Sequence, residues 1–142
     1  TAAMTMLMTY PGVPSVFMGD ELGFEGNSGE DARRTINWED RSSWDTTFFA
    51  EVKKLAKLRR TDDAFINGGL RWVTAEDNYL AYLRESKKSK VLVVIAAKPC
   101  TVDIDLSKLG YKVSKTLYGQ KATGSKIKFK TNGATQGIWK LS

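Results

Sequence analysis

The residues best suited to chemistry lie between positions 11 and 40, where a short apolar run meets a loop rich in glycine and charge. The run at residues 13–18 has the length of a strand that is buried on both faces. It ends at Gly19, and Asp20 and Glu21 then supply two carboxylates. In enzymes built on parallel strands, binding groups collect at the carboxyl ends of the strands. The arrangement therefore predicts a site for a sugar or a phosphate.

The adjacent acids Asp20 and Glu21 are the first candidates for a catalytic pair. Hydrolysis of a glycosidic bond needs a carboxylate nucleophile or base and a separate carboxylic acid, which lie about 5 Å apart when the configuration is retained. Adjacent residues at the end of a strand point in opposite directions, so these two side chains cannot converge on one glycosidic oxygen. We therefore assign neither of them a catalytic role. Glu21 is expected to be structural at the strand end, orienting its neighbours by hydrogen bonds.

The loop that follows carries groups suited to bind sugar hydroxyls. Arg33 offers a planar fork of donors, and Asp20, Glu30 and Asp31 supply acceptors. We therefore predict a substrate-binding set of Arg33, Asp31, Glu30 and Asp20. In the alternative interpretation, Asp20 and Glu21 cap the turn after the strand, and Arg33 or Arg34 simply pairs with one of these two acids.

Two tryptophans, Trp38 and Trp44, flank the end of this loop. Each can stack on a sugar ring, because pyranose faces present apolar C–H groups to aromatic planes. Large aromatic residues also pack loops onto the body of a protein, and that is the more frequent role. The sequence leaves both roles open.

The composition does not indicate a metal or a cofactor. The 142 residues include no histidine and a single cysteine, Cys100, so the usual nitrogen and sulfur ligands of zinc are missing. Histidine-assisted serine or cysteine hydrolysis is excluded within the chain for the same reason. The stretch 23–31 has acidic and amide side chains, but it lacks the alternating ligands and the closing glutamate of a calcium loop. Its glycines are not followed by the lysine of a phosphate loop. Whether a longer protein that contains this chain binds calcium stays open.

The net charge of +6 is unevenly distributed, with lysines concentrated in residues 87–130. In residues 126–130 every second side chain is a lysine, which is typical of a strand with one solvated face. We therefore expect no nucleic-acid partner. The opening apolar residues stop at Pro11, far short of the roughly 20 needed to span a bilayer, so no membrane association is expected. No basic leader precedes them, so a signal peptide is not expected either, and the compartment stays unknown.

Three parts follow one another along the chain. Residues 1–44 hold a helix end, the apolar run and the loop, and residues 45–60 have helical periodicity. Asp45 can accept the first free amide protons of that helix, and Arg59 and Arg60 suit its carboxyl end. Residues 61–69 are expected to be a linker.

From residue 70 onwards the period of the apolar residues changes from 3.6 to 2. The expected strands are 70–74, 79–85, 91–97, 101–106, 112–118, 126–130 and 137–141. Asn132-Gly133 has the composition of a tight turn with positive φ angles. Regularly spaced short strands of this kind predict an antiparallel β-sandwich.

Residues 11–38 resemble the last barrel strand and the following loop of the α-amylase family, glycoside hydrolase family 13. The family pattern is Pro-Gly-x-Pro, a short apolar strand, Gly-Asp-Glu, an apolar residue, Gly, and then Arg-Arg shortly before Trp. The matching positions are Pro11, Gly12, Pro14, Gly19, Asp20, Glu21, Gly23, Arg33, Arg34 and Trp38. The likeness is greatest to the branch of neopullulanases, maltogenic amylases and cyclomaltodextrinases. That branch usually has an aspartate four residues before the first arginine, where this chain has Gly29, with Asp31 or Glu30 as candidate substitutes.

The resemblance implies a mixed fold in two domains. Residues 1–65 would be the C-terminal end of a (β/α)8 catalytic barrel, with a helix end, the eighth strand, the loop and the final helix. Residues 70–142 would be the whole antiparallel β-sandwich domain that follows the barrel.

The implied parent is a retaining glycosidase that acts on α-glucans such as starch, maltodextrin or cyclodextrin. Its catalytic carboxylates would precede residue 1, so this segment alone is predicted to be inactive. The alternative is a non-catalytic carbohydrate-binding or structural β-sandwich module. Because an unpaired apolar strand invites association, we expect self-association or dependence on the missing barrel.

Overall fold

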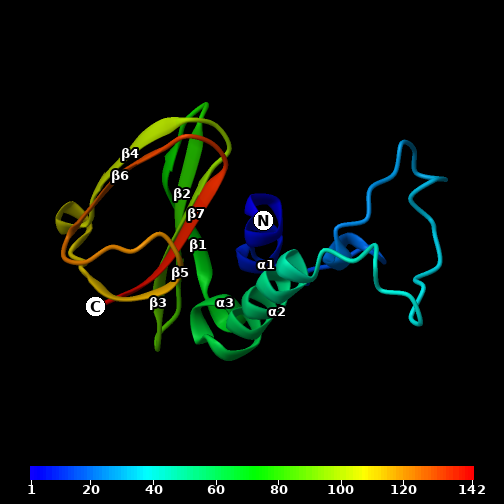
Figure 1. The fold of residues 1–142 in the computed structure, drawn as a ribbon. Coiled ribbons are helices and arrows are strands. Elements are labelled where there is room, and N and C mark those ends of the chain that lie inside the picture. The colour runs from blue at the N-terminus through cyan, green and yellow to red at the C-terminus, as the bar shows by residue number, and fades with distance from the viewer.

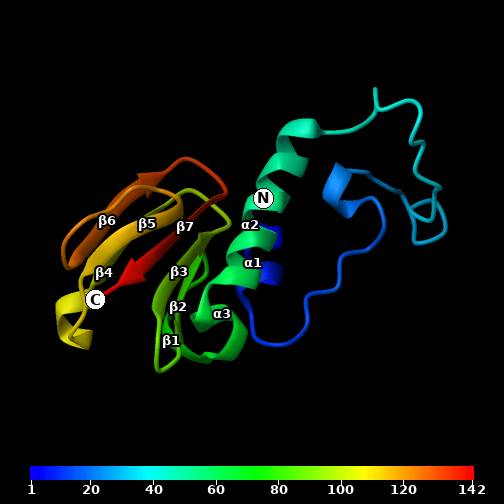
Figure 2. The same ribbon diagram turned by 90° about the horizontal axis from the view of Figure 1, so that it is seen from below.

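The computed structural model describes all 142 residues, which form three layers (Figure 1). A two-stranded sheet lies against one face of a five-stranded sheet, and the helices cover the other face. The view from below shows the same order of layers, with the stretch before α2 extending away from them (Figure 2). None of the helices combines the length and the apolar character needed to cross a membrane.

Every strand pair in both sheets is antiparallel. The larger sheet has the order β1-β2-β3-β7-β5, and β4 pairs only with β6. The strands are β1 (Gly69–Ala75), β2 (Tyr79–Glu85), β3 (Lys90–Ala96), β4 (Cys100–Asp105), β5 (Val113–Gly119), β6 (Lys126–Thr131) and β7 (Thr135–Leu141). The seven strands expected from the alternating pattern are thus all present, with ends that differ by up to two residues.

The helical layer contains α1 (Ala2–Thr9), α2 (Thr46–Thr61) and the short α3 (Asp63–Asn67). Asp45 caps α2 as expected, since its carboxylate accepts a hydrogen bond of 2.8 Å from the amide of Phe48. Two 3-10 turns, η1 (Asp20–Leu22) and η2 (Leu106–Leu109), complete the chain.

The continuous apolar sequence of β3 follows from its place between two cores. Val91, Val93 and Ile95 face the helices, where they join a cluster with residues of α1, α2 and α3. Leu92 and Val94 face the two-stranded sheet and pack with residues of β4, β6 and β7. Because successive side chains of a strand point to opposite faces, a strand covered on both sides has no position for solvated polar residues.

The core between the two sheets is built around Trp139, which is fully buried. Its ring lies 6.4 Å from that of Phe129, measured between centroids. A Cβ added to Gly137 would lie 2.1 Å from this indole ring, so the glycine provides the space that the tryptophan occupies. On the outer face of β6 the lysines alternate with buried or half-buried residues, as the sequence pattern predicted.

Three local expectations are wrong. Residues 13–18 form no strand and run as largely exposed coil, in which Val13 is 94% exposed and Val16 is half-buried against the helix-facing core. A buried parallel strand needs a hydrogen-bonded neighbour on each side, and no other segment of this chain supplies one. The expected linker contains α3, which Asp62 caps by accepting a 3.0 Å hydrogen bond from the Ala64 amide. Asn132-Gly133 has no positive φ angle and joins the two sheets rather than closing a hairpin.

Candidate functional site

The turn after residues 13–18 is formed by glycines in left-handed conformations that other residues adopt rarely. Gly19 and Gly23 flank η1 with φ angles of 98° and 75°. A Cβ on Gly19 would also lie 2.7 Å from the ring of Phe24. The Glu21 carboxylate accepts a 3.0 Å hydrogen bond from the Gly19 amide, so it points back into the turn. That contact is of the kind expected from a residue that supports the turn.

The loop beyond η1 is held by short-range contacts between its own acids and arginines. The Asp31 carboxylate accepts hydrogen bonds from the Asn27 amide, at 3.0 Å, and from the Arg34 guanidinium, at 2.5 Å. The hydrogen bond from Arg34, together with that from the Asn27 amide, lowers the pKa of Asp31. Arg33 pairs with Glu30, whose side chain is 85% exposed. Asp31 is therefore engaged inside the loop, whereas the pair of Arg33 and Glu30 lies in solvent.

The structure brings together three of the four predicted binding residues. Arg33, Glu30 and Asp31 lie in one tight loop, but Asp20 lies in η1 and makes no side-chain hydrogen bond or ion pair with any of them. A groove of about 440 Å³ opens beside this loop. Among its lining residues are Arg34, Glu25 and Asn37, which sequence reasoning did not select.

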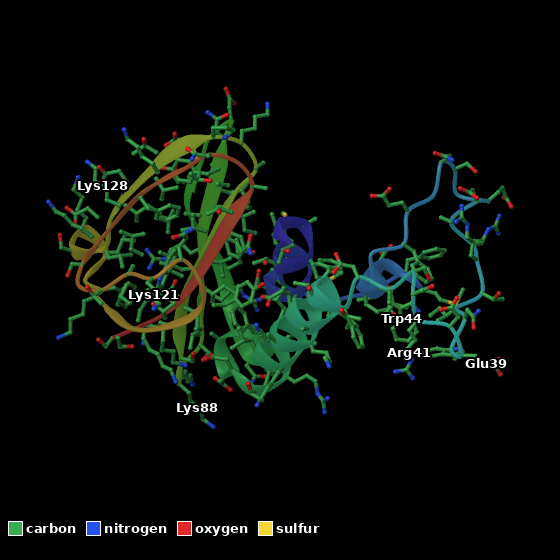
Figure 3. The ribbon with its side chains drawn as sticks, in the orientation of Figure 1. Glu39, Arg41, Trp44, Lys88, Lys121 and Lys128 are labelled. Carbon is green, nitrogen blue, oxygen red and sulfur yellow. The ribbon has the colours of Figure 1, made fainter.

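The two tryptophans at the end of the loop differ in their surroundings. Trp44 contacts Phe49 of α2 edge-on, at 6.2 Å between ring centroids, and the Arg41 guanidinium lies 4.9 Å above the indole. Figure 3 shows Trp44 and Arg41 near each other on the part of the chain that extends from the layers. Trp38 contacts Trp44 at 5.6 Å and is 64% exposed. Trp44 thus anchors the loop to α2, and Trp38 keeps an open face.

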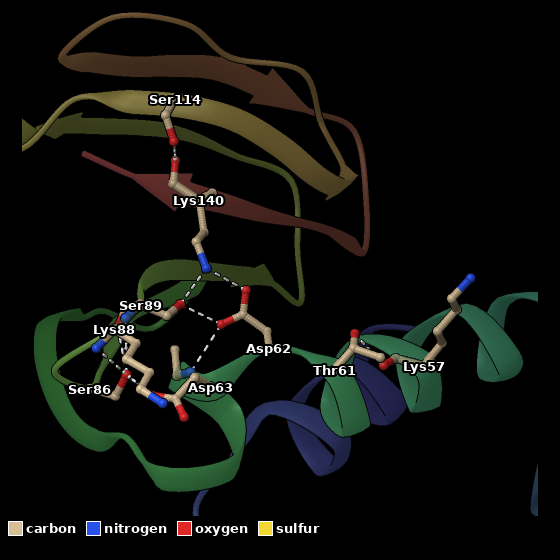
Figure 4. Close-up of polar contacts among 10 residues, drawn as sticks. Lys57, Thr61, Asp62, Asp63, Ser86, Lys88, Ser89, Ser114 and Lys140 are labelled. Atoms are coloured by element: carbon tan, nitrogen blue, oxygen red, sulfur yellow. Dashed lines mark hydrogen bonds and ion pairs between the residues drawn. The ribbon is translucent and has the colours of Figure 1, made fainter.

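A polar cluster that sequence reasoning missed lies between the helices and the larger sheet (Figure 4). The Lys140 ammonium of β7 donates to the Asp62 carboxylate at 2.7 Å and to the Ser89 hydroxyl at 2.5 Å. Ser89 also donates to Asp62, and Ser86 donates to Asp63. Burial opposes ionisation of Asp62, but the hydrogen bonds from Lys140 and Ser89 outweigh it and lower the pKa of this carboxyl.

This cluster contains a serine beside a lysine, a pairing that serves as a nucleophile and base in some enzymes. Ser89 is only 4% exposed, however, so a substrate has no access to its hydroxyl. The cluster is therefore a structural joint between layers. The sequence signal that hints at it is Lys140, a lysine between the apolar residues Trp139 and Leu141 of β7.

No family profile matches the sequence, but individual curated proteins do. A cyclomaltodextrinase from Bacillus sp. is 34% identical over 95 residues, which are 66% of this chain and 17% of that protein. Neopullulanase 2 from Thermoactinomyces vulgaris is 32% identical over 95 residues, 66% of this chain and 16% of the relative. A cyclomaltodextrin glucanotransferase from Bacillus sp. (strain 1-1) is 26% identical over 142 residues, 96% of this chain and 19% of the relative. The chain thus spans less than a fifth of these proteins.

Solved structures share the fold of almost the entire chain. The trehalulose synthase from Pseudomonas mesoacidophila MX-45 matches with a TM-score of 0.79 at 18% identity, covering 99% of this chain and 38% of that one. A debranching enzyme from Nostoc punctiforme matches with a TM-score of 0.78 at 22% identity, covering 97% of this chain and 28% of that one. At these identities the likeness establishes the fold alone. The curated relatives of more than 30% identity show that the chain belongs to the α-amylase family, glycoside hydrolase family 13, as a C-terminal part.

Proposed function

We propose that the chain is the C-terminal segment of a larger retaining glycosidase that acts on α-glucans such as starch, maltodextrin or cyclodextrin. The observation that carries this proposal is the 34% identity to a cyclomaltodextrinase over two-thirds of the chain. The further relatives named maltogenic alpha-amylase and neopullulanase 2 support the same substrate class.

Residues 1–65 would form the end of the catalytic barrel and residues 70–142 the appended β-sandwich. The distribution of exposed apolar side chains supports this division. Val13, Phe17, Met18 and Trp38 are exposed and belong to the first part, whereas Trp72 is the one exposed large apolar side chain of residues 70–142. The sandwich core, in contrast, is closed by its own strands. An apolar surface of this kind normally faces another protein surface, and a preceding barrel would cover it.

The catalytic carboxylates would lie upstream, because the adjacent acids at the end of residues 13–18 do not converge on one point. Glu21 is turned back onto Gly19, and Asp20 lies beside it in the same turn. The segment would contribute glucan binding instead. Arg33 is the foremost candidate, since its exposed ion pair with Glu30 costs little to exchange for a pair of sugar hydroxyls. Asp31, Glu30 and Asp20 complete the proposed set.

The test compares the full-length protein with the 142-residue chain. Release of reducing ends from maltodextrin is expected from the full-length protein and not from the chain alone. The anomer formed first, followed by NMR, should have the configuration of the substrate bond. Cleavage by the isolated chain, or none by the full-length protein, would contradict the proposal. Calorimetry of the isolated chain with maltoheptaose distinguishes this proposal from the binding-module alternative. Clear binding would favour the module, and no binding would favour the segment of a glycosidase.

A further inference from the structure

Arg84 of β2 is a buried cation that has no carboxylate partner. It is 2% exposed and faces the helical layer. Its guanidinium donates instead to four backbone carbonyls: Gly68 at 2.7 Å, Phe65 at 3.2 Å, Gly69 at 3.3 Å, and Thr9. Burial of a charged group is costly unless its donors are hydrogen-bonded. The four carbonyls therefore compensate for the burial of this guanidinium.

Three of the four carbonyls that Arg84 binds come from the ends of two helices, and the fourth belongs to Gly69, the first residue of β1. Thr9 is the last residue of α1, and Phe65 and Gly68 lie in and just after the last turn of α3. The final carbonyls of a helix lack partners within the helix and carry partial negative charge. Arg84 thus joins both helix ends to the sheet. The partial negative charge of these ends takes the place of a carboxylate partner.

The segment from Thr9 to Gly12 is held by two further side chains. The Tyr82 hydroxyl of β2 makes a 2.5 Å hydrogen bond with that of Thr9. Arg59 of α2 donates to the carbonyl of Tyr10 at 2.8 Å and to that of Gly12. Gly12 has a φ of 105°, so the chain turns sharply at a position that suits only glycine. Thr9, Tyr10 and Gly12 are therefore held from β2 and α2.

This fixed segment leads directly into residues 13–18 and the loop that carries Arg33. The far end of the same stretch is fixed as well, because the Asp45 amide donates to the Leu22 carbonyl at 2.9 Å and Trp44 packs on α2. Between these two anchors, Val16 packs against the helix-facing core. The carbonyls that Arg84 and Arg59 bind precede Val16 in the chain, so they act on the direction in which the stretch leaves α1.

We propose that Arg84, supported by Arg59, is a positioning residue for the glucan-binding loop. It fixes the backbone at residues 9–12 and thereby sets where the stretch 13–38 begins. This role rests on the proposed function. Neither arginine makes a hydrogen bond or ion pair with a residue of the loop, so their effect on a glucan passes entirely through the backbone.

The test uses the full-length protein with Arg84→Met and the matched control Lys140→Met. Both substitutions remove a cation between the layers, but Lys140 has no contact with residues 9–18. Amide hydrogen exchange at Thr9 and Tyr10, in the last turn of α1, should become about tenfold faster in Arg84→Met than in Lys140→Met. The KM for maltodextrin should rise about threefold or more, with kcat changing less, because the loop binds rather than reacts.

A second pair of variants tests the positioning role if Arg84→Met folds poorly. Arg59→Met removes the donors to Tyr10 and Gly12, whereas the neighbouring Arg60 makes no side-chain hydrogen bond or ion pair and provides the control Arg60→Met. Only Arg59→Met should raise the KM. Arg84→Lys keeps the charge without the planar fork, so its exchange rate should fall between those of the wild type and Arg84→Met.

Two results would overturn the positioning role. One is equal acceleration of exchange at Thr9 and Tyr10 in Arg84→Met and Lys140→Met, which would make Arg84 a general contributor to stability. The other is an unchanged KM in both Arg84→Met and Arg59→Met. If the unmodified full-length protein fails to cleave maltodextrin, the proposed function is wrong, but the exchange comparison still decides whether Arg84 fixes the segment.

Discussion

The sandwich and the loop at residues 19–45 are held by different kinds of contact. The sandwich depends on residues distant in sequence, such as Leu92 and Trp139, which meet in one core. The loop depends on pairs three residues apart, Arg33 with Glu30 and Arg34 with Asp31, and on its anchor at Trp44. Long-range apolar contacts exclude water and fix a unique structure, whereas exposed ion pairs contribute little. The sandwich thus specifies itself, while the loop keeps side chains available for a ligand.

The largest difference between the two regions is expected from adding one methyl group to a glycine in each. Gly137→Ala places a Cβ against the buried Trp139 ring and should lower the free energy of unfolding by about 3 kcal/mol. Gly29→Ala in the loop meets nothing within 4 Å and should change it by less than about 0.5 kcal/mol. Denaturant unfolding measures both values. Equal effects would contradict the contrast between a closed core and an open loop.

The exposed apolar residues just before the loop provide the second prediction. Phe17→Ser should weaken self-association of the 142-residue chain by about 2 kcal/mol, because burial of this half-exposed side chain between copies is lost. Sedimentation over a concentration series measures the change. Val73→Ser on β1 provides the control in the sandwich and should leave association unchanged. A wild-type chain that stays monomeric at every concentration would refute the expectation of association.

Within the loop, the third prediction concerns Arg33. In the full-length protein, Arg33→Ala should raise the KM for maltodextrin about tenfold, since a charged planar donor to sugar hydroxyls is removed. Arg60→Ala, an exposed arginine on α2, is the control and should have no effect. If Arg33→Ala leaves both KM and kcat unchanged, Arg33 does not contact the glucan.

The smallest expected effect is a pH dependence located at the joint of Asp62, Ser89 and Lys140. The pKa of Asp62 is lowered in the folded chain from its ordinary value of 3.8. Its contribution to stability is therefore present above pH 3.8 and is lost as the pH falls through the folded pKa. Urea unfolding between pH 5 and pH 2 should show a steeper loss of stability for the wild type than for Asp62→Asn. Identical slopes would mean that the joint makes no net electrostatic contribution.

The sequence predicted best what depends on local pattern. The strands from β1 to β7 and the Asp45 cap were predicted because alternation and capping require only neighbouring residues. The prediction of a strand at residues 13–18 was wrong because a parallel ladder needs partner strands that this chain does not contain. At the site, the loop of Glu30, Asp31 and Arg33 is compact, since short spacing keeps them together whatever the fold.

What the pattern could not predict are contacts between residues far apart in the chain. Asp62, Ser89 and Lys140 come from three separate elements and meet only after the helices dock on the sheet. Arg84 looks like an ordinary strand residue until the carbonyls around it are known. Such groups have no characteristic spacing, and only the tertiary structure reveals them.

The double coverage of β3 has a consequence for how the molecule unfolds. The side chains of this strand alternate between the two cores. Neither the helices nor the two-stranded sheet can therefore detach without exposing one apolar face of β3 to water. Melting of one layer therefore weakens the other. We expect a single cooperative heat-absorption peak for all three layers, with a calorimetric enthalpy equal to the van't Hoff value.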